Sequence, residues 1–305
     1  MKKRKAQWID ILLTILLLAF NSQNRKLKII AMNQILEKVL FSEKVAKFVV
    51  DAPRIAHSRK PGHFVIIRVD EKGERIPLTI AGADPVKGTI DLVVQKMGVS
   101  SSKLFELNVG DFILDVVGPL GKATHIHKPG TILACGGGVG VAPMLPIVEA
   151  FKKAGNRVIS ILAARNKDLI ILEDEIRKWS DEVIIMTDDG SYGTKGLVTA
   201  GAEMVIQRET VNECIAIGPA VMMKFTSLLT KKYQIPTQAS LNAIMVDGTG
   251  MCGACRVSVG GQTLFTCIDG PEFDAHQIDF NELIVRLGGY SAEEKLANER
   301  YLKHN

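Results

Sequence analysis

Short runs of alternating hydrophobic and polar residues dominate the chain from residue 32 to about residue 117. The runs Ile35–Phe41 and Val45–Asp51 are rich in β-branched residues and are separated by a turn, which is typical of a hairpin. Similar runs recur roughly every 10 residues without helical periodicity, and this pattern predicts a small closed antiparallel barrel. The other expected elements are the strands His63–Val69, Arg75–Ile80, Thr89–Gln95 and Asp111–Val117 and the helix Ser102–Leu107.

The pattern changes after Gly121, where buried strands begin to alternate with amphipathic helices. Strands that alternate with helices are typical of βαβ units, so a doubly wound parallel sheet is expected here. The expected strands are Thr131–Ala134, Val158–Ala163, Val183–Met186 and Glu213–Ile217. The expected helices are Met144–Ala154, Leu169–Trp179, Gly196–Gln207 and Ala220–Lys232.

The remaining chain combines a second hairpin with one last helix at Ala292–His304. Arg256–Val259 and Gln262–Thr266 flank a Gly-Gly pair, and such a pair favours a two-residue hairpin turn. The sequence therefore predicts a β plus α/β fold in three parts. These are an antiparallel β-barrel over residues 32–128, a doubly wound parallel-sheet domain over 129–235, and a C-terminal part over 236–305 with a cysteine loop and a helix.

Residues 1–31 form an extension with a different composition. Four basic residues precede the apolar run Ile11–Phe20, as in a signal peptide, but the small residues of a cleavage site do not follow. The run is shorter than the roughly 20 residues that span a bilayer. We therefore expect that Met32 is the true first residue, that 1–31 is not part of the fold, and that no stable membrane insertion occurs. A genuine signal or membrane anchor is the alternative.

Charge and composition exclude some function classes. The net charge of +5 arises in residues 1–31, which hold seven Lys or Arg and one Asp, so the rest of the chain is nearly neutral. Aromatic residues make up only 6% of the chain, which argues against stacking on nucleic acid. The cysteine count is five, an odd number, and three of these residues lie between 252 and 267. This distribution favours a metal site in a reducing compartment, the cytoplasm, over secreted disulfides.

The cysteine loop carries the most specific motif. Plant-type iron–sulfur loops have the spacing C-x4-C-x2-C and a distant fourth cysteine. The chain has this spacing with Asp247 in place of the first cysteine, followed by Cys252, Cys255 and Cys267. The expected hairpin brings Cys255 and Cys267 together at its open end. These four residues are therefore the predicted ligands of a [2Fe–2S] cluster. A zinc site, or an Asp247 that supports the cluster without binding it, is the alternative.

A glycine-rich loop follows the first strand of the parallel sheet. A strand, glycines and a helix start present backbone N–H groups to a diphosphate, and Val141 stands where a third fingerprint glycine is usual. No acidic residue follows the next strand, where Arg165 lies, so NAD and NADP both remain open. A tight turn without a ligand is the alternative. The predicted nucleotide-binding residues of this loop are Gly137, Gly138, Gly140, Ala142 and Pro143.

Three further segments contain weaker candidates. Arg75 could neutralise a diphosphate, while Pro77, Leu78 and Thr79 on the same expected strand could meet a planar ring. A second candidate phosphate site consists of Gly98, Ser100 and Ser101, although serine there is also a common helix cap. Two carboxylates after the third strand of the parallel sheet either line the nucleotide pocket or cap a turn, and these are Asp188 and Asp189.

Taken together, the motifs resemble the ferredoxin–NADP reductase superfamily. Four of its motifs occur in the correct order, at Arg75–Thr79, Gly98–Ser101, Gly118–Gly121 and Gly137–Pro143. The resemblance implies FAD in the barrel and a nicotinamide nucleotide, NAD(H) or NADP(H), in the α/β domain. It also implies that Val94 and Gln95 belong to the FAD pocket and that Gly218 and Pro219 flank the nicotinamide.

The cysteine loop narrows the resemblance. It is similar to the loop of dihydroorotate dehydrogenase electron transfer subunits, and still more similar to that of the small subunits of NADH-dependent ferredoxin–NADP oxidoreductases, which have the Asp variant. This implies an oxidoreductase subunit that passes electrons from NAD(P)H through FAD and a [2Fe–2S] cluster to a larger flavin and [4Fe–4S] subunit, and to ferredoxin through the complex. No side chain need act as an acid or base. The alternatives are a dihydroorotate dehydrogenase subunit of pyrimidine biosynthesis and a non-enzymatic metal-binding adaptor.

Overall fold

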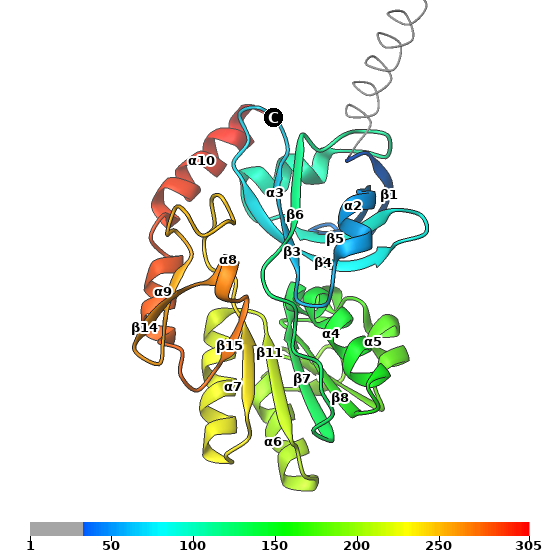
Figure 1. The fold of residues 1–305 in the computed structure, drawn as a ribbon, viewed down its shortest axis with the longest axis vertical. Coiled ribbons are helices and arrows are strands. Elements are labelled where there is room, and N and C mark those ends of the chain that lie inside the picture. The colour runs from blue at the N-terminus through cyan, green and yellow to red at the C-terminus, as the bar shows by residue number, and fades with distance from the viewer. Residues whose placement is uncertain (1–32, 305) are drawn as a thin grey trace, which may run out of the picture.

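The computed structural model of the chain describes residues 33–304, so the expectation for residues 1–31 lies outside the described part (Figure 1). The described chain forms a barrel, an α/β unit below it in the view of Figure 1, and a C-terminal segment along one side of both. No helix in this range is long and apolar enough to cross a membrane.

The first unit is a six-stranded antiparallel sheet in the order β1-β2-β5-β4-β3-β6. The ends of the sheet meet, because Gln34 bridges to Phe112 and the N–H of Ile35 donates to the carbonyl oxygen of Asp111 at 2.9 Å. The interior is apolar and includes Phe48, which is fully buried. The predicted barrel is therefore confirmed. Its elements are β1 (Ile35–Ser42), β2 (Val45–Asp51), α2 (Pro53–Ser58), β3 (Phe64–Arg68), β4 (Ile76–Asp84), β5 (Thr89–Gln95), α3 (Val99–Glu106) and β6 (Asp115–Leu120).

The second unit is a seven-stranded sheet in the order β10-β9-β8-β7-β11-β12-β15, parallel except for β15. The chain runs outward from β7 in one direction and then from β11 in the other, so the sheet has its switch point between these two strands. The doubly wound fold is confirmed. The elements are β7 (Thr131–Gly137), η1 (Gly138–Gly140), α4 (Val141–Lys153), β8 (Arg157–Ala164), η2 (Lys167–Leu169), α5 (Glu173–Trp179), β9 (Glu182–Thr187), β10 (Thr194–Lys195), α6 (Val198–Arg208), β11 (Glu213–Ile217), α7 (Ala220–Lys232) and β12 (Thr237–Ser240).

The C-terminal segment is joined to both units. Its strand β15 pairs with β12, and at the far end Tyr301 donates a hydrogen bond of 2.6 Å to Glu106 of the barrel. Figure 1 shows α10 beside the barrel and α9 beside α7. The domain division at residue 235 remains a prediction. The elements are β13 (Arg256–Val259), β14 (Gln262–Phe265), α8 (Thr266–Asp269), β15 (Glu272–Asp274), α9 (Phe280–Leu287) and α10 (Ser291–His304).

The barrel packs directly on the α/β unit. Val45 of β2 and Ala81 of β4 belong to the same buried cluster as Ala142 and Met144 of α4. The start of α4 is therefore held against β4, and the η1 turn contacts β5. This packing fixes the glycine loop next to the barrel strands on which flavin-binding residues are predicted.

Several elements were not expected from the sequence. Helix α2 begins with Pro53, and proline is favoured in the first turn of a helix. Helix α9 is capped by Asp279, whose carboxylate accepts hydrogen bonds of 3.0 Å from the N–H groups of Asn281 and Glu282. Strands β10, β12 and β15 are only two to four residues long, too short for a readable alternation.

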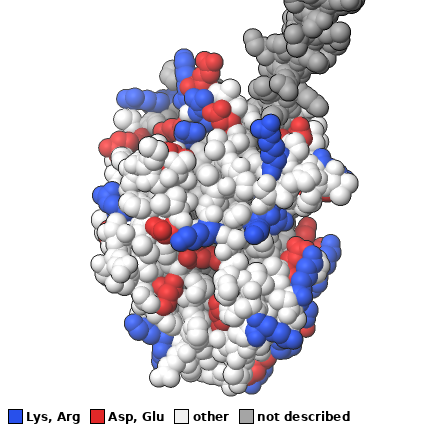
Figure 2. All heavy atoms as spheres, in the orientation of Figure 1, with Lys and Arg blue, Asp and Glu red and all other residues white. Residues whose placement is uncertain are grey.

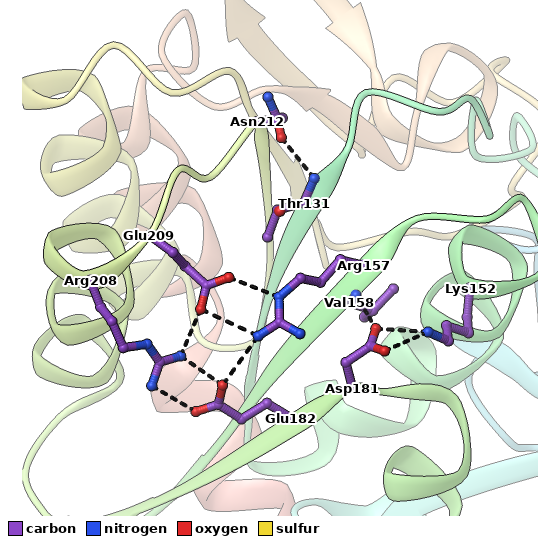
Figure 3. Close-up of polar contacts among 9 residues, drawn as sticks. All are labelled: Thr131, Lys152, Arg157, Val158, Asp181, Glu182, Arg208, Glu209 and Asn212. Atoms are coloured by element: carbon purple, nitrogen blue, oxygen red, sulfur yellow. Dashed lines mark hydrogen bonds and ion pairs between the residues drawn. The ribbon is translucent and has the colours of Figure 1, made fainter.

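Ion pairs join the amino ends of the parallel strands to helix α6 (Figure 3). Arg157 at the start of β8 donates to Glu209 at 2.8 Å, and Arg208 donates to Glu182 at 2.6 Å. The charged face in Figure 2 is likewise a mixture of both signs, without one dominant patch. These pairs stabilise the end of the sheet at which the parallel strands begin, opposite the end that carries the glycine loop.

Asp181 holds three elements of this edge together. It accepts a hydrogen bond of 2.8 Å from the N–H of Val158 and two from Lys152, at 2.7 and 2.8 Å. Partial burial acts to raise the pKa of Asp181, but the bonds from Lys152 and from the Val158 N–H outweigh it, so the pKa is lowered.

We expect Asp181→Ala to lower the free energy of unfolding by about 1–2 kcal/mol at pH 7, since it removes a backbone partner and an ion pair. Because the pKa is lowered in the folded state, the difference should shrink as the pH falls from about 4 through the still lower folded-state pKa, since the carboxyl of Asp181 is then protonated in the folded and the unfolded protein alike. Urea unfolding at pH 7 and pH 3 measures both effects. Lys87→Ala, which removes an exposed pair with Asp84, is the control and should change stability by less than about 0.5 kcal/mol. Equal losses in the two variants would contradict the role of Asp181.

Candidate functional site

The glycine loop lies at the switch point of the parallel sheet, where ligands of such sheets bind. A side chain on Gly140 would collide with the carbonyl oxygen of Ile217, so glycine is required for the loop to approach the end of β11. Gly138 has a φ of +55° and no protein atom within 4 Å of where a Cβ would stand, so this position faces open space. Helix α4 has no side-chain cap. The N–H of its first residue, Val141, donates to the carbonyl oxygens of Gly138 and Val139, and Pro143 has no N–H, so an anion here would rely on N–H groups of the preceding turn η1 and of Ala142.

The other predicted nucleotide residues divide into two groups. Gly218, next to Pro219, lies against the glycine loop, because a Cβ on it would be 3.1 Å from the Gly137 nitrogen. The turn after β9 contains the predicted carboxylates. Asp189 accepts a hydrogen bond of 2.9 Å from the N–H of Ser191, and hydrogen bonds from Ser191 lower the pKa of Asp189. Asp189 thus acts as a turn cap, while Asp188 is exposed.

The predicted flavin residues follow two neighbouring barrel strands. Arg75 is exposed just before β4, and Pro77, Leu78 and Thr79 are only partly buried, which leaves this stretch of β4 open to a ligand. On β5 the side chain of Val94 is 2% exposed and packs in the barrel core, so only its backbone can face a ligand. Gln95 remains partly exposed.

The candidate phosphate site at the start of α3 is organised by Ser101. Its hydroxyl oxygen accepts hydrogen bonds of 2.9 Å from the N–H groups of Met97 and Gly98. The Ser101 hydroxyl is therefore occupied in shaping the turn, as a helix cap. Ser100 is partly exposed and has the freer side chain of the two serines.

The C-terminal hairpin brings two cysteines into contact, as its Gly-Gly turn predicts. Val259 pairs with Gln262, and the N–H of Thr266 donates to the carbonyl oxygen of Cys255 at 3.0 Å. The sulfur atoms of Cys255 and Cys267 are 3.2 Å apart, and both residues are 1% exposed. The Cys267 N–H also points at the Cys255 sulfur, at 3.4 Å.

The other two predicted ligands, Asp247 and Cys252, are connected by a hydrogen bond between a side chain and a backbone N–H. One carboxylate oxygen of Asp247 accepts from the N–H of Thr249 at 2.8 Å and the other from the N–H of Cys252 at 2.9 Å. These bonds, led by the one from Thr249, lower the pKa of Asp247. Cys252 is exposed. Within residues 33–304, no three His, Cys, Asp or Glu side chains are close enough together to hold a metal ion.

The buried part of this loop suits an iron–sulfur group. Burial and the neighbouring Cys255 raise the pKa of the Cys267 thiol to about 12, so a Cys267 thiolate is unfavourable unless a cation binds it. The Thr266 hydroxyl oxygen is buried and has no hydrogen-bond partner among the described residues. Cluster sulfur atoms accept such hydrogen bonds. Thr266 was missed from the sequence, where its position next to Cys267 was the only available signal.

The cysteine loop also packs against the barrel. A Cβ on Gly248 would lie 2.8 Å from side-chain carbons of Ile66 on β3 and Leu120 on β6. The buried cluster that contains Cys255 and Cys267 includes Ile66 as well. Strand β3 pairs along one edge with β4 and along the other with β6, so the cysteine loop lies over a strand that is the direct neighbour of the predicted flavin strand.

Two regions of the chain match known protein families. Residues 33–125 match the oxidoreductase FAD-binding domain, and residues 242–279 match the iron–sulfur cluster binding domain of dihydroorotate dehydrogenase B. These matches confirm FAD and an iron–sulfur cluster as the cofactors. A Thermotoga maritima homolog of the dihydroorotate dehydrogenase B (NAD(+)) electron transfer subunit is 47% identical over 90% of this chain and 96% of its own length. A probable subunit of this kind from Methanocaldococcus jannaschii is 35% identical over 83% of this chain and 91% of its own.

Solved structures agree with this assignment. A chain of an NADH-dependent reduced ferredoxin–NADP oxidoreductase has a TM-score of 0.85 and 46% identity, and the match covers 89% of this chain and 98% of that one. The cytochrome b5 reductase domain of Ulva prolifera nitrate reductase, at 20% identity and a TM-score of 0.55, shares the fold over 67% of this chain and 92% of that chain. The chain therefore belongs to the family of dihydroorotate dehydrogenase B electron transfer subunits and their homologs, flavin and iron–sulfur oxidoreductase subunits with the ferredoxin–NADP reductase fold.

Proposed function

We propose that this chain takes a hydride from NAD(P)H onto FAD and passes the electrons through a [2Fe–2S] cluster to a larger flavin and [4Fe–4S] subunit of a ferredoxin–NADP oxidoreductase. The observation that supports this most directly is the contact of the cysteine loop with β3, the direct neighbour of β4. FAD supplies the conversion of a two-electron hydride into single electrons. The protein contributes the binding and relative placement of the three groups.

Separate sets of residues are proposed for each group. The start of α4 would bind the nucleotide diphosphate through backbone N–H groups, with Gly138 leaving room for it. Arg75 and the open stretch of β4 would bind FAD. The nucleotide-binding residues are Gly137, Gly138, Gly140, Ala142, Pro143, Asp188, Asp189, Gly218 and Pro219. The flavin-binding residues are Arg75, Pro77, Leu78, Thr79, Val94, Gln95, Gly98, Ser100 and Ser101. The cluster ligands are Asp247, Cys252, Cys255 and Cys267.

The partner subunit would bind around the cysteine loop. Three apolar side chains there are exposed, Met251 at 88%, Val246 at 51% and Ile268 at 42%. An apolar rim around an electron carrier suits a protein partner that excludes water from the transfer path. The ferredoxin–NADP oxidoreductase assignment is favoured over dihydroorotate dehydrogenase by Asp247, the Asp variant of the cysteine loop, together with the structural match at a TM-score of 0.85. Thiolate ligands require reducing surroundings, so the proposed compartment is the cytoplasm.

Purification of the native complex tests the whole proposal. The expected product contains this chain and a larger flavin and iron–sulfur subunit, with more than one flavin and more than two irons per copy of this chain, and it reduces ferricyanide with NADH or NADPH. Co-purification with a dihydroorotate-oxidising subunit would support the pyrimidine alternative. A native chain with iron but without flavin absorbance would support the adaptor alternative.

We expect Gly138→Ala to raise the KM for NAD(P)H roughly tenfold in ferricyanide reduction, about 1.4 kcal/mol of binding, while FAD content stays unchanged. The added methyl group meets no protein atom within 4 Å, so it would oppose only a bound diphosphate. Gly261→Ala is a matched control, because Gly261 also has a positive φ, +76°, and an open surrounding. An equal KM in the two variants would contradict a nucleotide site at Gly138.

We expect Asp247→Cys to retain a [2Fe–2S] EPR signal at a shifted reduction potential, since a thiolate donates more charge to iron than a carboxylate does. Asp247→Asn keeps one acceptor for the loop N–H groups but loses the charge, and should lower the iron content. Redox titration monitored by EPR, together with iron analysis, measures both. If both variants keep the wild-type signal and potential, Asp247 only shapes the loop.

A further inference from the structure

A cavity of about 210 Å³ lies on the other side of the segment that carries Cys267. It is lined by the connection between the two units, by β11 and β12 of the parallel sheet, by Phe151 of α4, and by the start of β15. Lys122 and His127 at its rim are exposed, so it opens to solvent, and its ionisable side chains are mostly carboxylates and histidines. The residues that matter are Lys122, Thr124, His127, Glu213, Asp269 and Glu272.

Glu272 has no positive partner in this cavity. One of its oxygens accepts a hydrogen bond of 2.7 Å from the Thr124 hydroxyl. Among residues 33–303, no Lys, Arg or His nitrogen lies within 4.0 Å of its carboxylate. Burial of this carboxyl group, opposed by the Thr124 bond and assisted by the negative charge of Glu213, raises the pKa of Glu272 to about 7.

The basic side chains that face the cavity lie beside carboxylates other than that of Glu272. On the connecting segment, His127 lies 3.1 Å from Glu213 of β11, and His125 stacks on His127. Lys122 of the same segment lies 3.7 Å from Asp269, the last residue of α8. Burial raises the pKa of Glu213 as well.

One further segment borders Glu272. Gly62, which precedes β3, lies close to its carboxylate. The ionisable neighbours of Gly62, Lys60 and His63, make a backbone-to-ring hydrogen bond with each other at 3.1 Å, and neither forms an ion pair with Glu272. No fixed positive charge thus lies next to the Glu272 carboxylate. A charge added nearby therefore shifts the pKa of Glu272.

The cluster site is close to Glu272 along the chain. Glu272 is the fifth residue after Cys267, a span of at most about 17 Å when fully extended. Gly270 and Pro271 between them are buried, as is Cys267 itself. Charges that interact through the protein interior are screened much less by salt than charges at the surface. A change of charge at the cysteine pair therefore changes the electrostatic potential at the Glu272 carboxylate.

We propose that Glu272 is a proton acceptor coupled to reduction of the cluster that Cys255 and Cys267 help to bind. This inference rests on the proposed function. NAD(P)H, oxidised through FAD, is the source of the electron. When one electron reaches the cluster, the Glu272 carboxylate takes one proton from water in the cavity and forms one O–H bond. When the electron leaves for the partner subunit, that bond breaks and the proton returns to water.

The coupling has a definite sign. An added negative charge favours the neutral carboxylic acid and raises the Glu272 pKa above its value of about 7 in the oxidised protein. Between this value and the higher Glu272 pKa of the reduced protein, reduction takes up a proton and becomes less favourable as the pH rises. The equilibrium constant for reduction then falls by up to tenfold per pH unit, which is 59 mV for a one-electron couple. Below the oxidised-state pKa the potential is independent of pH.

The test is a redox titration of the cluster, monitored by EPR, between pH 6 and pH 9. The wild-type potential should fall as the pH rises above about 7, and Glu272→Gln should abolish this dependence. Thr124→Val should move its onset to higher pH, because the Thr124 hydrogen bond lowers the Glu272 pKa. Glu299→Gln, an exposed carboxylate on α10, is the control and should keep the wild-type profile.

The outcomes are distinguishable. A wild-type potential that does not change with pH, or the same dependence in Glu272→Gln as in the wild type, would overturn the coupling and leave the proposed function intact. A wild-type protein without a [2Fe–2S] signal would overturn the proposed function and the coupling with it. Thr124→Val is a second, independent readout should Glu272→Gln fold poorly.

Discussion

The structure depends most on strand β3, which neighbours both the cysteine loop and β4, the strand proposed to bind flavin. On one side β3 pairs with β4, and over its buried Ile66 it meets Gly248 of the cysteine loop. Only a residue without a side chain permits this approach, because a Cβ on Gly248 would press on Ile66 and Leu120. An electron carrier in the loop is thereby held at a short, fixed separation from the barrel. The rest of the C-terminal segment maintains this contact, since β15 extends the parallel sheet and α10 reaches back to α3.

Much of this architecture could be predicted because it follows from local pattern. The strands β2, β5 and β11 and the helix α7 follow directly from alternation and helical periodicity. The Gly260-Gly261 turn fixed the register of its hairpin and hence the meeting of Cys255 with Cys267. What could not be predicted depends on contacts between distant segments. Strand β15 is three residues long and exists only because β12 offers it an edge.

The candidate site shows the same division. Motif spacing indicated the glycine loop and the cysteine loop, but it could not indicate which side chains would be occupied by local hydrogen bonds. Ser101 and Asp189 both serve as caps, and Val94 faces the barrel core. Asp247 accepts two N–H groups of its own loop, so its carboxylate organises the loop whether or not it also binds iron. Glu272 is not part of any sequence motif. Its environment comes from the connecting segment and β11, which are distant from it in the sequence.

The central claim is that electrons pass from a nicotinamide nucleotide through FAD to the cluster within this one chain. Anaerobic addition of NADH or NADPH to the purified protein, frozen for EPR after the flavin absorbance has been recorded, tests it most directly. The account predicts flavin bleaching together with the signal of a reduced [2Fe–2S] cluster. Bleaching of the flavin without that signal, in a protein whose cluster dithionite can reduce, would contradict it.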